Sequence, residues 1–462
     1  MEPPRAARSY APGLLLALYG LQAALLVWLL ALFKFAHRFP ALTTREAVLL
    51  LVPLAVSLAC AIYVVRCFRR MAARAFALAL ATNGVTVVIV TAALEIGIRL
   101  FAVPAPEGIA FANTVLLPKD WNGVRRRNAR LLESAPANIS YFVSDELLGW
   151  TVGKSRRSTD GLYMSSAEGI RSPRSDTVYT EARAPRRIAI VGDSYTFGLE
   201  VPFHESWGFG LEQALGPEFT ILNFGVDGYG VDQAYLRSER DVRPWHPAMT
   251  LFGFIAHDLY RSRVVYPFVS FPDWGFPFSK PRFTLEAGSL HLLNAPLPRP
   301  EEVLARGSIA DLPFVQYEPA YRPAEWERQP YDASYLVRFL RSRFPRYPVS
   351  NPAAELDAVS RLNGELLLAF ARRATHDGTE PLIVYFPSRG DFEGQDRSAK
   401  LTVLGILERS GVRYVDLTSC IQAADPARAF LAHRPHYSAH GNAAVARCLL
   451  PTVVNRLGKT PK

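Results

Sequence analysis

A serine and a distant histidine are the first residues in the sequence that point to chemistry. Ser194 lies in Gly192-Asp193-Ser194, directly after the apolar run Ile188–Val191. Open α/β sheets bind their ligands at the carboxyl ends of such strands. Serine by itself is a weak nucleophile and needs a neighbouring base. His436 is the candidate base, because it precedes the last apolar helical run of the chain and is free to reach back to Ser194.

Two further segments could stabilise the negative charge that an attack by Ser194 would create. The glycine-rich turn Gly225–Gly230 can present the backbone N–H of Gly228 to an oxyanion, and His257 follows the next apolar run as a possible second donor. The spacing G-x-x-G-x-G matches neither the dinucleotide-binding pattern nor the Walker pattern, so no organic cofactor is expected. The sequence contains no C-x-x-C, and no metal site is expected either.

The elements that must position these residues follow from the hydrophobic pattern. Near-continuously apolar runs, typical of buried parallel strands, alternate with helical patterns such as Leu356–Arg373. This alternation predicts an open α/β sheet over residues 187–462. The expected strands are Ile188–Val191, Phe219–Asn223, Thr250–Phe254, Leu382–Phe386 and Val412–Asp416.

Two segments depart from this rhythm. Residues of about 264–347 are rich in proline and aromatic side chains, and we interpret them as an insertion, either a substrate cap or a structural excursion. Residues 102–186 are polar, with many Pro, Ser and Arg, and predict a linker or stalk.

Residues 1–101 predict a transmembrane region. Three stretches, at about 14–33, 47–65 and 76–98, are apolar over the ~20 residues that a bilayer span needs. Four arginines (Arg66, Arg69, Arg70 and Arg74) lie between the second and third stretches, and positive charge marks the cytoplasmic side. The domain after the third span is therefore expected on the extracytoplasmic side of a bacterial inner membrane. Glu95 and Arg99 are expected to form an i,i+4 pair at its outer end.

The net charge bears on the possible partners, and the cysteines bear on a possible disulfide. The net charge of +10 is concentrated beside apolar segments and in the run Arg125–Arg127, and no nucleic-acid-binding signature accompanies it, so nucleic acid is not an expected partner. Cys420 and Cys448 flank the histidine motif. They are either a disulfide, if the domain is extracytoplasmic, or two unrelated buried thiols.

The chemical motifs taken together resemble the SGNH, or GDSL, hydrolase family. The resemblance rests on G-D-S at Ser194, the second-block glycine at Gly228 and the last-block histidine at His436, and it covers roughly residues 187–456. It implies a flavodoxin-like three-layer α/β/α fold, with Ser194 as nucleophile, His436 as general base, and the N–H groups of Ser194 and Gly228 in the oxyanion hole. Upstream, Asp145–Trp150 and Glu168–Arg171 resemble segments that precede the domain in bacterial members linked to cell-surface polysaccharides.

The sequence departs from the family pattern at two points. The third-block asparagine is replaced by His257, which can still donate from one ring nitrogen. The family's usual acid, two or three residues before the histidine, is missing, because those positions hold Arg434 and His433. Three explanations stay open: a Ser–His dyad that suffices by itself, a substitute acid elsewhere such as Asp416, or a loss of catalysis.

Two functions remain open at this point. The first is a serine esterase or acyltransferase that acts on an ester-linked acyl group, expected to be acetyl, of an extracytoplasmic glycan or lipid. The second is a membrane-anchored module without catalysis that binds a glycan or an assembly partner through the same groove. The missing acid favours the second function, and the intact G-D-S and His436 favour the first.

Overall fold

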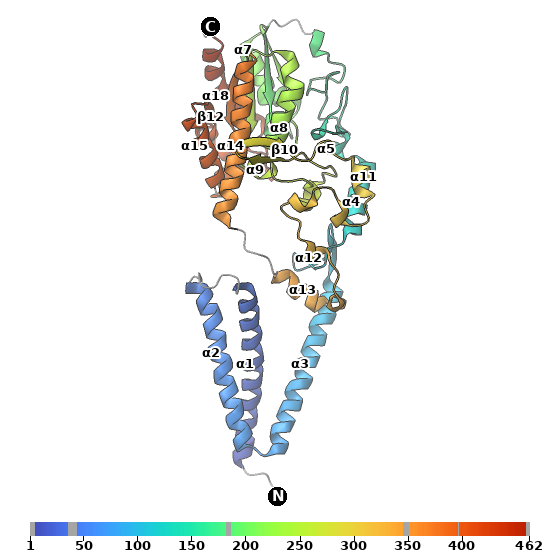
Figure 1. Cartoon of the computed structure of the whole chain (residues 1–462), viewed down its shortest axis with the longest axis vertical. Helices are drawn as coiled ribbons and strands as arrows, with labels where there is room; N and C mark the ends of the chain where they lie inside the picture. The colour runs from blue at the N-terminus through green and yellow to red at the C-terminus, as the bar shows by residue number, and fades with distance from the viewer. Residues whose placement is uncertain (1–4, 36–43, 182–185, 345–350, 396, 459–462) are drawn as a thin grey trace. The chain divides into compact units, whose positions relative to one another are not determined.

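The computed structural model describes residues 5–35, 44–181, 186–344, 351–395 and 397–458 (Figure 1). The chain forms two compact units, each made of two segments. Unit 1 comprises Met1–Gly123 and Arg322–Ser350, and unit 2 comprises Val124–Tyr321 and Asn351–Lys462.

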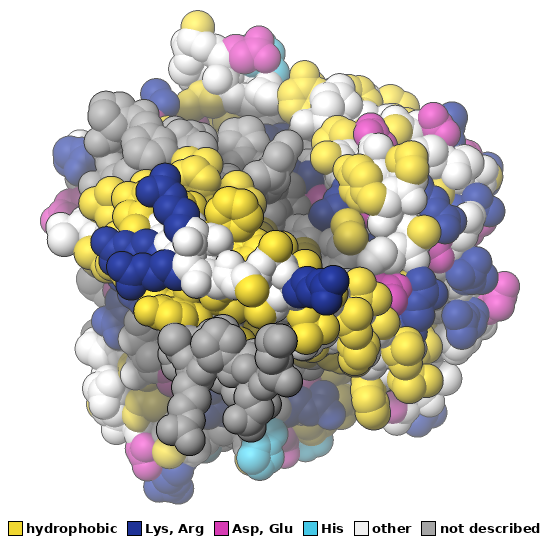
Figure 2. All heavy atoms as spheres, turned by 90° about the horizontal axis from the view of Figure 1, so that it is seen from below, with side chains coloured by type: hydrophobic (Ala, Val, Ile, Leu, Met, Phe, Trp, Pro, Cys, Tyr) yellow, Lys and Arg dark blue, Asp and Glu magenta, His cyan; other side chains and the backbone are white. Residues whose placement is uncertain are grey.

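Unit 1 contains three helices that are long and apolar enough to cross a membrane, as the sequence predicts. They are α1 (Arg5–Phe35), α2 (Thr44–Arg70) and α3 (Ala73–Phe101). Many of their large apolar side chains are exposed, which suits a lipid environment and not water. Figure 2 looks onto the end of these helices and shows basic side chains among apolar ones.

Polar contacts inside unit 1 tie its helices to one another. Gln22 of α1 and Asn83 of α3 exchange amide hydrogen bonds of 2.7 and 3.3 Å. Glu95 accepts a hydrogen bond from Arg99 at 2.6 Å, which confirms the predicted i,i+4 pair. The same carboxylate also accepts the N–H of Leu336, at 2.8 Å, and so caps the short helix α13 (Tyr335–Arg343). Glu95 is therefore a structural residue of unit 1.

Unit 2 is built on a five-stranded parallel sheet with the order β12-β11-β8-β6-β7. Numbered along the chain this order is 2-1-3-4-5 from the β7 edge, the flavodoxin-like arrangement that the sequence resemblance implies. All five predicted strands are present, with bounds that differ by at most a few residues. They are β6 (Arg186–Val191), β7 (Phe219–Asn223), β8 (Met249–Phe254), β11 (Glu380–Tyr385) and β12 (Tyr414–Asp416).

Helices cover both faces of this sheet and enclose two apolar cores (Figure 1). In β6, Ala189 and Val191 face the core under α14 (Pro352–His376), whereas Ile188 and Ile190 face the core under α18 (Ala439–Arg456). Because both faces are buried, strands such as β6 and β8 are largely apolar at successive positions. This burial explains why the strands are recognisable in the sequence.

The structure divides the chain at other residues than the sequence suggests. Residues 124–181, inside the expected linker, belong to unit 2, where Tyr141 and Trp150 are 1% exposed. The expected insertion is shared: its part up to Tyr321 belongs to unit 2, and Arg322 onwards to unit 1. Residues 345–347 of it lie outside the described residues. These segments contain few long regular elements and contribute scattered buried side chains such as Tyr141 and Trp150, so their local pattern resembles a loop.

The remaining strands and α-helices complete the two units. They are β1 (Val103–Ala105), β2 (Gly108–Phe111), β3 (Thr114–Val115), α4 (Trp121–Ser134), α5 (Ala137–Ser140), β4 (Phe142–Asp145), β5 (Gly149–Val152), α6 (Ser194–Phe197), α7 (Trp207–Leu215), α8 (Val231–Arg237), α9 (Ala256–Arg261), α10 (Pro267–Ser270), β9 (Phe283–Glu286), β10 (Ser289–Leu292), α11 (Pro300–Leu304), α12 (Pro323–Trp326), α15 (Ser398–Arg409), α16 (Thr418–Ala423) and α17 (Pro426–Ala429).

Candidate active site

Ser194 stands at a sharp turn between β6 and the single-turn helix α6. A side chain at Gly192 would place its Cβ 2.3 Å from Thr196 Oγ1 and 2.4 Å from the carbonyl oxygen of Gly253, so the turn requires glycine there. Asp193 caps α6, because its carboxylate accepts the N–H groups of Tyr195 and Thr196 at 3.0 and 3.3 Å. The local sequence therefore fixes the serine at the carboxyl edge of the sheet.

The structure brings His436 to this serine from the other end of the domain. His436 Nε2 lies 2.9 Å from Ser194 Oγ, although the two residues are 242 positions apart. Tyr195 supports the arrangement, since its hydroxyl donates a 2.6 Å hydrogen bond to the carbonyl of Pro435. The predicted pair is thus within hydrogen-bonding distance.

Glu200 supplies the carboxylate that the sequence lacks next to His436. Its Oε2 lies 2.8 Å from His436 Nδ1, and its Oε1 accepts a hydrogen bond of 2.8 Å from Arg434. Glu200 itself adopts a left-handed backbone conformation, with φ of 68°. Such conformations are costly for a residue other than glycine and are concentrated at functional sites. Ser194, His436 and Glu200 therefore have the connectivity of a nucleophile–base–acid triad.

The hydrogen bonds assign the protons of this triad. Burial raises the pKa of Glu200, but the hydrogen bonds and charges of His436 and Arg434 outweigh it and hold the pKa below its usual value. An ionised carboxylate only accepts, so Nδ1 of His436 carries the proton that it donates to Glu200. In the neutral imidazole the lone pair of Nε2 is then directed at the hydroxyl of Ser194, as a general base requires.

Sequence reasoning missed Glu200 because it sought the acid beside the histidine. The positions two and three before His436 do hold Arg434 and His433, but Arg434 is part of the site and binds Glu200. The one available signal was the position of Glu200, six residues after the serine in the loop at the same sheet edge. A search for acids in every loop at that edge would have included it.

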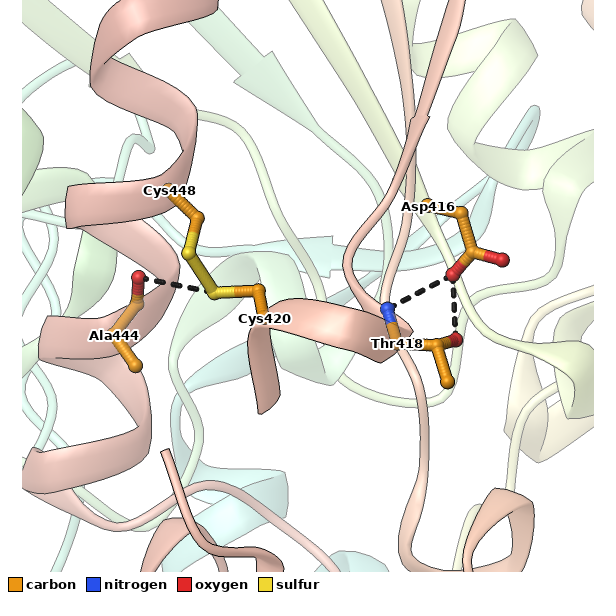
Figure 3. Close-up of a disulfide and its surroundings, with 5 residues drawn as sticks. All are labelled: Asp416, Thr418, Cys420, Ala444 and Cys448. Carbon is orange, nitrogen blue, oxygen red and sulfur yellow. Dashed lines mark hydrogen bonds between the residues drawn. A yellow bond between two sulfur atoms is a disulfide. The ribbon is translucent and has the colours of Figure 1, made fainter. Parts of the chain in front are cut away.

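Asp416, the substitute acid considered from the sequence, has other partners. Its Oδ1 accepts from the N–H of Thr418 at 2.9 Å (Figure 3). Its Oδ2 lies 3.0 Å from Lys400 Nζ. The neighbouring α16 carries Cys420, which forms a disulfide with Cys448 of α18. Asp416 thus bonds to neighbours of β12, and the carboxylate that contacts His436 is Glu200.

The residues expected in the oxyanion hole line one cavity together with His436. Ser194, Gly228, His257 and His436 all border a cavity of about 910 Å³ in unit 2. Gly228 has φ of 80°, a left-handed conformation that favours glycine. Desolvation in the cavity and the nearby Arg261 guanidinium lower the pKa of His257 to about 3. His257 is therefore neutral at physiological pH and keeps one N–H to donate.

A buried charge cluster lies behind the serine turn. Arg261 donates to Asp258 at 2.7 Å and lies 3.9 Å from Asp193. Burial raises the pKa of Asp193 to about 6, even though Arg261 and the helix N–H groups that it caps favour the ionised form. The guanidinium of Arg261 also stacks over Trp274, 4.5 Å from its ring centroid. The cluster connects the turn at Ser194 to the segment that follows α9.

The segment after α9, where an insertion was expected, forms part of the cavity wall. Trp274 and Phe276 border the cavity, and Phe271 stacks on Trp274 with ring centroids 4.0 Å apart. Polar side chains complete the wall on other sides, among them Arg389, Glu393 and Gln395. The cavity thus combines aromatic walls with groups that can bind hydroxyls.

Comparison with known proteins gives matches among solved structures. No protein-family model and no curated protein matches the sequence. The chain is similar in structure to a member of the lipolytic G-D-S-L family from Veillonella parvula (12% identity, 58% of this chain and 97% of that chain, TM-score 0.31). It is also similar to a catalytic mutant of an acetylxylan esterase from Geobacillus stearothermophilus (15% identity, 60% and 96%, TM-score 0.31) and to a carbohydrate acetylesterase family member from Sinorhizobium meliloti (13%, 59% and 99%, TM-score 0.29).

Proposed function

We propose that unit 2 is a serine esterase or acyltransferase of the SGNH type that forms an acyl-enzyme at Ser194. The observation that carries the proposal is the hydrogen-bonded chain from Ser194 through His436 to Glu200, with contacts of 2.9 and 2.8 Å. A serine becomes a nucleophile when an adjacent base is oriented by a third group, and this chain supplies both.

The reaction then follows from the positions of the protons. Ser194 Oγ attacks the carbonyl carbon of an ester while its proton passes to His436 Nε2, and the charge of Glu200 stabilises the cation that results. The tetrahedral intermediate expels its alcohol, which takes the proton back from His436. Water or an acceptor hydroxyl next attacks the acyl-enzyme by the same proton transfers in reverse, and the free serine returns.

The oxyanion of the intermediate would be held by the N–H groups of Ser194 and Gly228 and by His257. Three features support this assignment: the cavity that these residues share, the glycine conformation at position 228 and the neutral state of His257. Loss of one such donor typically lowers kcat about 10²–10³-fold.

The substrate belongs to a narrower part of the proposal, an acyl group, expected to be acetyl, on a glycan or a lipid. Arg389, Glu393 and Gln395 at the cavity wall suit a hydroxyl-rich alcohol. A series of p-nitrophenyl esters tests the acyl part: acetate is expected to react fastest, and a preference for octanoate would contradict a small acyl group. Acetylated oligosaccharides, assayed for acetate release, test the alcohol part.

We further place the catalytic unit on the extracytoplasmic side of a bacterial inner membrane. The Cys420–Cys448 disulfide supports this side, because disulfides persist in oxidising compartments. The arginines that surround the turn from α2 to α3, with Arg69 and Arg70 in the last turn of α2, support a cytoplasmic position for that turn. Protease added to intact spheroplasts should degrade unit 2, and full protection would contradict the placement.

Covalent labelling tests the catalytic proposal itself. The full chain in detergent should react with a fluorophosphonate probe, and Ser194→Ala should abolish the label. A second serine, Ser206, caps α7 in the same unit and serves as a matched control: Ser206→Ala should keep the label. If the folded wild-type chain is never labelled, the enzyme proposal fails. The alternative, a module that binds a glycan or partner without catalysis, would then take its place; its main support, a missing acid, is removed by Glu200.

A further inference from the structure

The residue that stands out beyond the triad is Arg171, a buried cation in the segment Glu168–Arg171. It is 1% exposed, and the described hydrogen-bond partners of its guanidinium are backbone carbonyls, with no carboxylate among them. Burial lowers its pKa to about 10, so the side chain remains charged at neutral pH. An unpaired charge in a protein interior is costly and persists where dipoles compensate it.

Backbone carbonyls around Glu200 provide that compensation. Arg171 Nη1 donates to the carbonyl oxygens of Phe197 and Gly198, and Nη2 donates to that of Val201 at 2.6 Å. The guanidinium also lies 4.3 Å from the centroid of the Phe197 ring. The loop that carries Glu200 is therefore held on both sides of the acid by one side chain.

Arg171 is itself attached to the sheet through its backbone. The N–H of Arg171 donates to the carbonyl of Asn223 at the end of β7, at 3.2 Å, and Tyr179 donates its hydroxyl to the carbonyl of Arg171. The hydroxyl of Tyr163 accepts the N–H of Glu200 at 3.0 Å. The upstream segment thus reaches the acid through two side chains.

Gly198 shows how closely the guanidinium approaches the loop. This residue has φ of 75°, and a Cβ on it would lie 2.9 Å from Arg171 Nη1. The left-handed turn at Gly198 and the left-handed conformation of Glu200 together bend the loop back toward His436. Both are conformations that a free loop would rarely hold.

We propose that Arg171, assisted by Tyr163, is a positioning residue for catalysis, which holds the loop 197–201 so that Glu200 meets His436. The inference rests on the proposed function, since it assigns Arg171 to the triad. A methionine could fill much of the same apolar space, but it could not bind three carbonyls at fixed angles. Glu200 lies in a loop, so a residue outside that loop must hold it in place. The buried guanidinium of Arg171 meets this need.

The test measures kcat and KM of the full chain in detergent with p-nitrophenyl acetate. Arg171→Met should lower kcat about 10- to 100-fold, the effect of a displacement of the acid by roughly 1 Å, with little change in KM. In a Glu200→Gln background the same change should cause no further loss, because the positioned group is already disabled. Arg171→Lys supplies a point charge and fewer directed donors, so its kcat should lie between those of the wild type and Arg171→Met.

A matched control is Arg237, a second buried arginine that is 2% exposed and donates to Gly169 and Thr151 instead of the loop 197–201. Arg237→Met should lower the melting temperature yet change kcat by the same factor in both backgrounds. If Arg171→Met behaves like this control, or leaves kcat unchanged, Arg171 is structural and the inference is wrong.

Tyr163→Phe keeps the inference testable if Arg171→Met does not fold. It removes the oxygen that accepts the Glu200 N–H and leaves the ring in place. A several-fold lower kcat in the wild-type background, absent in Glu200→Gln, supports the inference; an unchanged kcat or an equal loss in both backgrounds overturns it. A failure of the triad itself is separate, because it would leave the wild-type chain without activity or label.

Discussion

Two strands of the sheet in unit 2, β6 and β12, each lead to a carboxylate at the carboxyl edge of the sheet, Glu200 and Asp416 respectively. After β6, Glu200 bonds to His436 and Arg434 at 2.8 Å each. After β12, Asp416 bonds to Thr418 and Lys400 instead. Asp416 closes a local turn with a residue two positions away, whereas Glu200 is held by residues from distant parts of the chain. Of the two carboxylates, Glu200 is the one that contacts the histidine at Ser194.

The largest effect expected from this comparison is that of Glu200→Gln. The amide keeps the shape but not the charge, so it neither stabilises the histidine cation nor selects the Nδ1–H tautomer. We expect kcat to fall about 10²–10⁴-fold, as for other triad acids. Steady-state kinetics with p-nitrophenyl acetate measure it, and circular dichroism checks the fold. A loss below about threefold would mean that a Ser–His dyad suffices without the acid.

Gly198→Ala changes the loop that carries Glu200 and acts on the acid less directly. The new methyl group would meet Arg171 and the Cβ of Ser206, each at 2.9 Å, at a φ that alanine rarely adopts. We expect a loss of about 1–3 kcal/mol in the free energy of unfolding together with a reduced kcat, measured by chemical denaturation and kinetics. Gly216→Ala is the control, since this glycine also has a positive φ but open space around its Cβ. Gly216→Ala should destabilise the protein without lowering kcat. An equal loss of kcat in both variants would mean that Gly198 has no specific effect on the position of Glu200.

Asp416→Asn should leave catalysis nearly intact. The change removes the charge that faces Lys400, whose ammonium remains over the ring of Tyr385 at 4.0 Å. We expect a loss of about 1–2 kcal/mol in stability and a kcat close to that of the wild type. Thermal denaturation and the ester assay measure the two quantities on one preparation. A kcat loss as large as that of Glu200→Gln would reverse the roles assigned to Glu200 and Asp416.

The smallest effect on activity is expected at the disulfide. Cys420 and Cys448 join α16 to α18 over a separation of 28 residues, near β12 and outside the triad (Figure 3). The double change to serine should reduce stability by about 2–4 kcal/mol and leave the kcat of the folded protein unchanged. Reduction of the wild-type protein should reproduce the shift in melting temperature. A loss of kcat as large as that of Glu200→Gln would show that the region around β12 also positions His436.

The sequence by itself determined the elements and two of the three proposed catalytic residues. Strands such as Ile188–Val191 are apolar at every position because both of their faces are buried, and the spans of α1 to α3 are apolar for the length of a bilayer. Ser194 was predictable because a strand and a glycine turn precede it, and His436 because it precedes an apolar helix. Each of these signals depends only on residues that are close together in the sequence.

Only the tertiary structure decided which acid serves the histidine. Glu200 and His436 are 236 positions apart, and nothing in the residues next to either one encodes their contact. Arg171 likewise lies in a polar stretch whose pattern resembles a linker, yet it is buried once β7 and the loop 197–201 come together. A side chain acquires such partners from the closure of the sheet edge, which depends on the whole domain, whereas the periodicity of a strand or helix depends on a few consecutive residues.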